Sequence, residues 1–91
     1  MAEAIWKFPI DPIPYSGDVS VFLPVKARIL TMQVDNKTGV PTMWAVVDPE
    51  ADKTRRQFVV VGTGDSPPDK AEYVGTYQAG PYVWHVFEVS R

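Results

Sequence analysis

Apolar and polar residues alternate in short runs along this chain, and clusters of Pro and Gly separate the runs. Runs that are rich in Val, Ile, Thr and aromatic residues, and bounded by turn residues, are typical of β-strands. No segment free of Pro and Gly has the apolar spacing of an amphipathic helix, and residues 50–58 have room for one helical turn at most. The pattern predicts an all-β fold of about seven short strands: Ala4–Phe8, Val19–Leu23, Ala27–Val34, Thr42–Val47, Gln57–Gly62, Glu72–Gln78 and Tyr82–Val89.

The connections between these strands are short, and two of them have the chemistry of hairpin turns. Residues 35–39 suit a type I turn that ends with Gly39 in the left-handed conformation, and residues 79–81 join the last two strands. Because short connections exclude helical crossovers, we expect a mostly antiparallel fold, either a small sandwich or a partly open barrel. The Pro-rich segment 9–14 is expected to run extended, turning the corner between two sheets or reaching over a neighbouring subunit.

Two strands carry information about their surroundings. The run from Phe58 to Val61 is apolar without alternation, so strand 57–62 is expected at the centre of a sheet with both faces covered. In the sixth strand, alternation places Tyr73, Gly75 and Tyr77 on one face, where Gly75 leaves a gap between two rings. In the simpler interpretation a large side chain from the neighbouring strand fills this gap. In the alternative, a nucleotide base or a partner's aromatic ring stacks there.

Composition describes one ordinary small domain that spans residues 1–91, with 45% hydrophobic and 22% charged residues. The net charge of −2 and the absence of any basic cluster argue against bulk nucleic-acid binding. The chain has no cysteine, which favours a reducing cytosol and excludes thiolate metal sites. No apolar run has the length of a membrane span, and the first residues lack the apolar region of a signal peptide. We therefore expect a soluble, cytoplasmic protein.

One histidine, His85, is the first candidate for chemistry, and alternation places it with Val83 and Phe87. As a catalytic base it needs an orienting partner, and no motif in the sequence supplies one. The simpler interpretation is a histidine that is hydrogen-bonded in or beside the core. With one histidine and no cysteine, a tetrahedral zinc site would have to rest largely on carboxylates, which argues against such a site. No cofactor fingerprint or catalytic triad spacing is present. We expect no enzymatic activity, no metal and no cofactor.

The loop that begins at Gly62-Thr63-Gly64 is the second candidate. It lacks the spacing of a phosphate-binding loop, and no helix can follow it to receive a phosphate. It is either the end of a strand that leads into a Pro-stiffened loop, or a binding loop that uses Thr63.

Four cations are the third candidate, because guanidinium and ammonium groups around one pocket can hold a phosphate-bearing ligand. The competing interpretation is ordinary surface charge that pairs with Asp48, Glu50 or Asp52. Aromatic rings, Trp84 among them, can stack on the base of such a ligand. The complete candidate ligand site comprises Lys26, Arg28, Trp44, Arg55, Arg56, Thr63, Tyr77 and His85.

Several segments together resemble a family of short proteins of unassigned function that bacteriophages and prophages encode. The resemblance spans nearly the whole chain and is most specific at Trp44-Ala45-Val46-Val47-Asp48-Pro49-Glu50 and at Gly62-Thr63-Gly64. Other matching segments are Ile5–Pro9, Ala27–Leu30 with Gln33, Tyr73–Thr76 and His85–Glu88. The resemblance implies a phage or prophage origin and action in the host cytoplasm. It brings no catalytic residues, and the long Pro-rich segment 9–17 departs from it.

Three functions follow from these observations. The first is a small binding protein that acts on a host protein or defence system through the loops 9–17, 48–56 and 62–70. The second is a protein that binds or sequesters a small anionic ligand such as a nucleotide. The third is a minor structural component of the virion. A thin core and open strand edges also favour a homo-oligomer formed by exchange of strand edges or of the Pro-rich arm.

Overall fold

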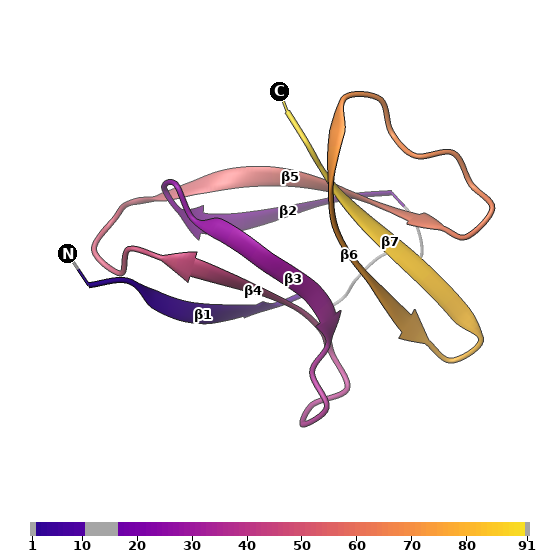
Figure 1. The fold of residues 1–91 in the computed structure, drawn as a ribbon, viewed down its shortest axis with the longest axis horizontal. Coiled ribbons are helices and arrows are strands. Elements are labelled where there is room, and N and C mark those ends of the chain that lie inside the picture. Colours follow the sequence, from indigo (N-terminus) through magenta and orange to yellow (C-terminus); the bar gives the residue numbers. More distant parts are fainter. Residues whose placement is uncertain (1, 11–16, 91) are drawn as a thin grey trace.

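The computed structural model describes residues 2–10 and 17–90, and the described chain forms an all-β fold (Figure 1). All seven predicted strands are present. No helix forms in residues 50–58, which lies within the predicted limit of one turn, and a strand already begins at Lys53. The strands are β1 (Ala4–Pro9), β2 (Gly17–Pro24), β3 (Arg28–Val34), β4 (Pro41–Val47), β5 (Lys53–Gly62), β6 (Ala71–Ala79) and β7 (Tyr82–Val89).

The strands form two sheets, a three-stranded sheet of order β1-β4-β3 and a four-stranded sheet of order β2-β5-β7-β6. Every pairing is antiparallel, as the short connections predict. β5 lies inside the four-stranded sheet, so its predicted central position is confirmed. Its inner residues Phe58 and Val60 are fully buried, whereas Val59 and Val61 on the opposite face are half-buried.

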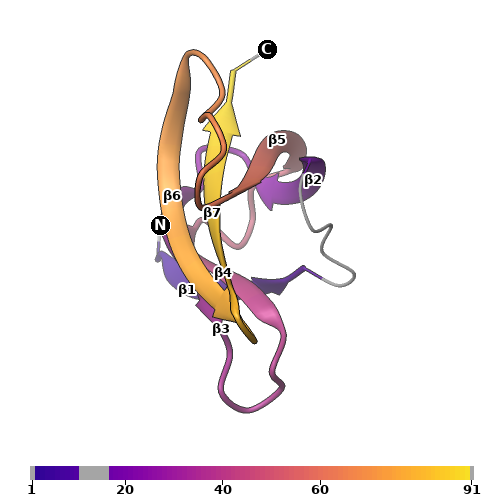
Figure 2. The same cartoon turned by 90° about the vertical axis from the view of Figure 1, so that its right-hand side faces the viewer.

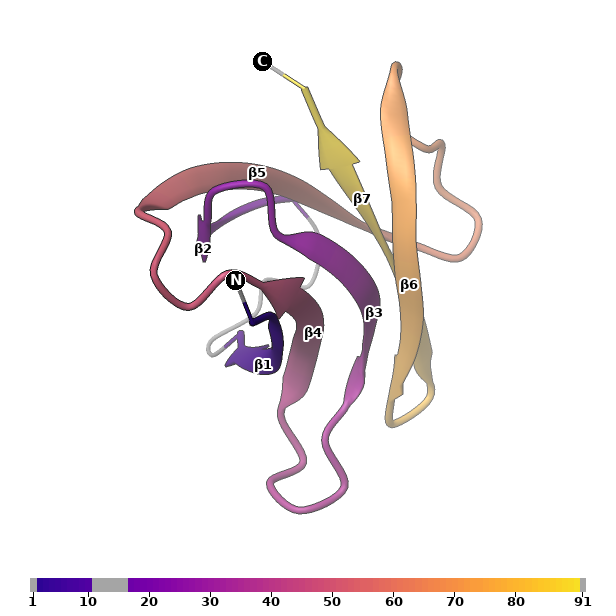
Figure 3. The ribbon, with the colours of Figure 1, turned by 60° about the vertical axis from the view of Figure 1, so that its left-hand side comes forward.

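The two sheets meet along one seam, where β3 and β6 lie side by side (Figure 3). Gly75 makes this approach possible. A Cβ atom at Gly75 would lie 2.7 Å from the backbone nitrogen and 2.8 Å from the carbonyl oxygen of Met32. The expected gap over Gly75 is therefore filled by the backbone of β3, not by a large side chain, because two backbones can touch only where one lacks a side chain.

β6 contains a bulge between Tyr73 and Gly75, and the extra residue changes which side chains share a face. Tyr77 points into the core and is 3% exposed, whereas Tyr73 lies on the opposite face and is 61% exposed. The prediction that these two rings flank Gly75 on one face is therefore wrong. A second bulge, between Ile29 and Thr31, shifts the register of β3 along the same seam.

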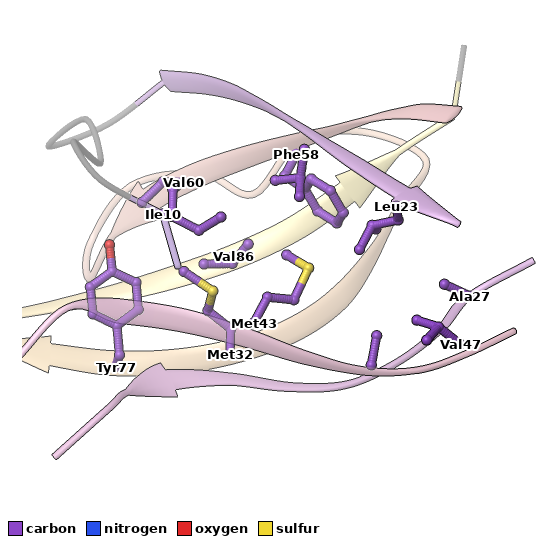
Figure 4. Packing of buried hydrophobic residues seen from close by; sticks show 12 residues of the cluster. Ile10, Leu23, Ala27, Met32, Met43, Val47, Phe58, Val60, Tyr77 and Val86 are labelled. Atoms are coloured by element: carbon purple, nitrogen blue, oxygen red, sulfur yellow. The ribbon is translucent and has the colours of Figure 1, made fainter. Parts of the chain in front are cut away.

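Side chains from both sheets fill the space between them (Figure 4). Alternation in each strand supplies them, since every second residue faces inward. Two methionines occupy the middle, where their flexible side chains fill irregular space. The buried apolar residues are Ile10, Val21, Leu23, Ala27, Met32, Met43, Ala45, Val47, Phe58, Val60, Tyr77 and Val86.

Both predicted hairpins are present. In the first, the amide groups of Thr38 and Gly39 donate to the Asp35 carbonyl, and Gly39 has a φ of +75°. In the second, Ala79 pairs with Tyr82, and Gly80 has a φ of +60°. The Pro-rich segment lies outside the described residues except for Pro9, which ends β1, and Ile10, which is buried in the core.

The connection between β5 and β6 is not a hairpin, because these two strands are not neighbours in the sheet. Both strands pair antiparallel with β7, which lies between them, so β5 and β6 run in the same direction. Residues 63–70 must therefore return along β7, over about 17 Å of strand, instead of turning back at once. They do so on the side away from the core (Figure 2). We call this segment the crossover loop.

Candidate functional site

The face of the four-stranded sheet that points away from the core is the first region with functional features. We call it the outer face. Its residues alternate with the buried Phe58, Val60 and Val86 and line up across three strands in the register of the sheet. Its centre contains no charged residue and consists of Val59, Val61, Tyr73, His85, Phe87 and Val89.

A continuous chain of hydrogen bonds crosses this face from β6 to the crossover loop. The Tyr73 hydroxyl lies 2.6 Å from Thr76 Oγ1, which lies 3.0 Å from His85 Nδ1. On the other side of the ring, Thr63 Oγ1 lies 2.8 Å from His85 Nε2 and 3.4 Å from the Val83 carbonyl oxygen. Both ring nitrogens of His85 therefore contact a threonine hydroxyl, which can donate or accept.

The tautomer of His85 follows from counting the protons in this chain. With the proton on Nε2, the ring donates to Thr63, and Thr63 donates to the Val83 carbonyl. Thr76 then donates to Nδ1, and Tyr73 donates to Thr76. With the proton on Nδ1 instead, Thr63 would donate to Nε2 and the Tyr73 proton would be left to the solvent. We assign the first arrangement to the neutral ring, because it gives every hydroxyl proton an acceptor within the protein.

A hollow of about 230 Å³ lies over this chain. Val61, His85 and Phe87 form its floor, and the crossover loop forms its rim. Gly64 allows the loop to turn here, because its φ of +102° is unfavourable for other residues. Gly62 lets the ring of Trp84 approach, since a Cβ at Gly62 would lie 3.1 Å from that ring. Among the residues that line the hollow, Asp65 is the charged one.

The second region is a cleft of about 460 Å³ where β3 and β6 separate beyond their seam. Arg28 and Arg56 both line this cleft, together with Glu72 and Glu88. Two of the predicted cations therefore share a cavity, but two carboxylates balance their charge. The cleft lacks the net positive charge that a phosphate-bearing ligand requires.

Arg56 is held by bonds within the protein. Its Nε donates to Glu88 Oε2 at 2.6 Å, its Nη2 donates to Glu88 Oε1 at 2.7 Å, and its Nη1 donates to the Ala27 carbonyl at 2.6 Å. The hydrogen bonds to Glu88 raise the pKa of Arg56 above its usual value. Arg56 therefore links β5 to β7 and to the segment before β3, and its partner is Glu88 and not Asp48, Glu50 or Asp52.

Of the other predicted site residues, Thr63 and His85 line the hollow, whereas Arg55, Lys26 and Trp44 lie elsewhere. Arg55 lines a separate hollow beside Arg56. Lys26 lies in the exposed turn before β3, with a φ of +65°. Trp44 is half-buried on the side of β4 away from the core, where it pairs with Lys7 and Thr31. Thr63 and His85 are the predicted pair that the structure brings into direct contact.

Tyr77 lies inside the core, which removes its ring from the surface. Its hydroxyl is buried and has no hydrogen-bond partner among the described residues. The ring extends across the core toward Ile10 and Val60 (Figure 4). Burial raises the pKa of Tyr77 to about 12, because the phenolate would lose its hydration there.

A family model described as "Domain of unknown function (DUF7352)" matches residues 1–91. The chain belongs to this family. Neither a curated protein nor a solved structure matches it. No described helix is long enough and apolar enough to cross a membrane. The described residues also contain no group of three or more His, Cys, Asp or Glu side chains placed to hold a metal.

Three contacts were not predicted from the sequence: Arg56 with Glu88, His85 with Thr76, and Thr76 with Tyr73. The Thr76–His85 contact was within reach. The turn at Gly80-Pro81 sets Ala79 opposite Tyr82, and counting back along both strands then places Thr76 opposite His85. Tyr73 lies beyond the bulge, which shifts its position by one residue and has no strong sequence signal.

Proposed function

We propose that the protein is a small binding module and that the outer face is its recognition surface for another protein. The observation that carries the proposal is the apolar run of β5. Both faces of this run are apolar, as in a strand covered on both sides. The fold buries Phe58 and Val60 on the inner face and leaves Val59 and Val61 half-buried on the outer face.

The composition of the outer face supports this function. Protein interfaces are depleted of charge at their centre and enriched in aromatic residues. The six central residues carry no formal charge when His85 is neutral, and they include Tyr73 and Phe87, whose rings contact edge to face at 5.8 Å. Phe22, which is 60% exposed, extends the same face at β2. The hollow under the crossover loop gives this otherwise flat surface a shape that a partner can recognise.

The finer predictions from the sequence belong to the same proposal. A host protein in the cytoplasm of an infected bacterium stays the expected partner, and a phage origin stays the implication of the resemblance. The two alternative functions, a binder of small anions and a virion component, gain no support from the geometry. Arg28 and Arg56 share the cleft with Glu72 and Glu88, which balance their charge, and Arg56 is paired with Glu88. Arg55 lines a separate hollow that also contains Glu88.

Affinity capture with a matched pair of variants tests the proposal. Tyr73 is 61% exposed on the outer face, and Ile5 is 63% exposed on β1 in the other sheet. Immobilised wild-type protein is used to capture partners from a lysate of the source cells, and each captured protein is then purified and titrated by calorimetry. We expect Tyr73→Lys to weaken binding at least about tenfold, because it places a charge in an apolar contact. We expect Ile5→Lys to change binding less than about twofold.

Equal effects of the two variants would contradict the proposed surface, and so would a partner whose affinity neither variant changes. Sedimentation of the purified protein covers the remaining case. If wild-type protein forms dimers and Tyr73→Lys is monomeric, the outer face joins copies of this chain, and the proposal of a different protein partner is wrong.

A further inference from the structure

The chain Tyr73–Thr76–His85–Thr63 joins a titratable ring to an exposed hydroxyl. We propose that protonation of His85 reverses the hydrogen bonds on the Nδ1 side and turns the Tyr73 hydroxyl outward as a donor. The outer face would then bind partners that present an acceptor, such as a carboxylate or a backbone carbonyl, more tightly at mildly acidic pH. The effect on partners rests on the proposed function, whereas the reversal itself is a property of the isolated protein.

The neutral ring leaves the Tyr73 proton inside the chain. Nδ1 has no proton in the assigned tautomer and accepts from Thr76, so Thr76 Oγ1 must itself accept from Tyr73. Although the Tyr73 side chain is 61% exposed, its hydroxyl proton is therefore directed to Thr76 and is not available to a partner.

Protonation of the ring adds a hydrogen to Nδ1. Nδ1 must now donate, so Thr76 Oγ1 accepts from it and its own proton is freed. In the proposed state this proton turns toward the Tyr73 oxygen, 2.6 Å away, because an oxygen that accepts from a cation becomes a stronger donor and a weaker acceptor. The Tyr73 oxygen becomes an acceptor within the chain, and its proton points outward. The Nε2 side does not change, because Nε2 donates to Thr63 in both states. No side chain has to move, since each hydroxyl rotates about its own bond.

The surroundings of His85 contain few other titratable groups. From β6, Tyr73 is the titratable side chain joined to it through Thr76, and Glu72 faces the cleft on the other side of the sheet. From the crossover loop, Asp65 lines the same hollow. On β5, Val61 lies opposite the ring. Arg55 of the same strand lies farther away, beyond Val59 and Gln57. The proposed reversal therefore depends on the protonation of the ring itself and on no neighbouring charged group.

Nuclear magnetic resonance of the purified protein tests the reversal directly. The ring nitrogens of His85 and the ring carbons of Tyr73 are followed between about pH 5 and 8. We expect the His85 nitrogen shifts at high pH to report a proton on Nε2. We also expect the Tyr73 resonances to change with the same midpoint as the His85 resonances. A proton on Nδ1 at high pH, or Tyr73 resonances that do not follow His85, would overturn the proposal.

A charge on His85 can also shift the Tyr73 resonances through space, and two threonine variants separate this effect from the relay. Thr76→Val removes the hydroxyl between the two rings and keeps a branched side chain suited to a strand. We expect the Tyr73 response to fall at least about threefold in Thr76→Val. Thr63→Val removes the hydroxyl on the other side of the ring and should leave the Tyr73 response within about 30% of wild type. A full response in Thr76→Val would show that charge alone is sensed and would overturn the relay.

The binding consequence is measured with a partner obtained by the capture experiment. We expect the affinity of wild-type protein relative to that of Tyr73→Phe to rise about three- to tenfold between about pH 8 and pH 5.5, because wild type gains one hydrogen bond while the charge on His85 affects both proteins alike. If capture yields no partner while the resonances behave as expected, the proposed function fails and the proton relay stands. If a partner binds through the outer face without this pH dependence, the relay has no role in recognition.

Discussion

Polar side chains form a network in two regions of the molecule, in the cleft between the sheets and on the outer face. In the cleft, Arg56 and Glu88 are charged, and their side chains are 22% and 21% exposed. On the outer face, Tyr73, Thr76, His85 and Thr63 form an uncharged chain when His85 is neutral, and it reaches the solvent. The network in the cleft joins β5 and β7 to the segment before β3. The network on the outer face joins β6 and β7 to the crossover loop.

This difference in charge and exposure predicts a different role for each network. A charged pair that is partly removed from water must keep its bonds, since either partner alone would be poorly solvated. Arg56 also holds the Ala27 carbonyl, so its loss would loosen the joint between the sheets. The hydroxyls of the outer face can exchange their partners for water at little cost. We therefore expect the cleft to govern stability and the outer face to govern recognition.

The largest effect is expected from Gly75→Ala, at the seam beside the cleft. The new Cβ would lie 2.7 Å from the Met32 backbone nitrogen, so β3 and β6 would have to separate. We expect a loss of about 3 kcal/mol in the free energy of unfolding, measured with urea.

Gly62→Ala is the matched control for this substitution. Its Cβ would lie 3.1 Å from the side chain of Trp84, which can shift, so we expect a loss of about 1 kcal/mol. A smaller effect at Gly75 than at Gly62 would show that the seam is looser than its geometry indicates.

Arg56→Met is expected to cost about 2 kcal/mol, since it leaves Glu88 without its bidentate partner. The double variant Arg56→Met/Glu88→Leu should recover part of this loss, because no unpaired charge remains. Urea unfolding of the two single variants and the double variant measures the coupling. If Arg56→Met is neutral, the pair is a surface contact, and the distinction between the two networks is lost.

The hydroxyl of Tyr77 belongs to neither network. Tyr77→Phe should raise the stability at pH 7 by about 1 kcal/mol, because it removes a buried hydroxyl without a described partner. Its pKa is about 12 in the folded protein and about 10 in an unfolded chain, so the unfolded state loses its proton first. Ionisation of Tyr77 therefore leaves the stability unchanged below pH 10 and lowers it as the pH rises to about 12.

The comparison with Tyr77→Phe isolates this contribution from the other groups that titrate at high pH. We expect the stability difference between the variant and the wild type to grow by about 1–2 kcal/mol between pH 10 and pH 12. Thermal unfolding at a series of pH values measures it. A constant difference would mean that the hydroxyl reaches water or another acceptor.

The smallest effect on stability is expected on the outer face. Thr76→Val and Thr63→Val each remove a hydroxyl that water can replace, so we expect changes below about 0.5 kcal/mol. Urea unfolding of these variants beside Arg56→Met compares the two networks in one experiment. A loss at Thr76 as large as at Arg56 would mean that the outer-face chain is part of the structural framework.

Much of the fold could be predicted from the sequence because its signals are local. Clusters of turn residues separate the strands, and the short apolar runs between these clusters place all seven strands. The Gly80-Pro81 turn even contains the register that brings Thr76 to His85. The faces of β6 could not be predicted, because a bulge at one residue exchanges the inside and the outside for all residues before it.

The candidate site was harder to predict because its partners are distant in the sequence. The lone His85 contacts one threonine across a hairpin and another from the crossover loop. Arg56 pairs with Glu88, 32 residues away, rather than with the acidic residues of its own turn. Sequence distance therefore suggested the wrong partner for Arg56 and none for His85.

The sequence by itself determined seven strands, two hairpins and the central place of β5, since these depend on turn chemistry and on the spacing of apolar residues. Tertiary structure alone decided how the two sheets meet and which surface stays open. Gly75 permits a contact between backbones that no pattern of side chains announces, and the return of the crossover loop along β7 follows from the order of the strands. These long-range contacts place His85 on the outer face and Arg56 in the cleft, which no local pattern in the sequence specifies.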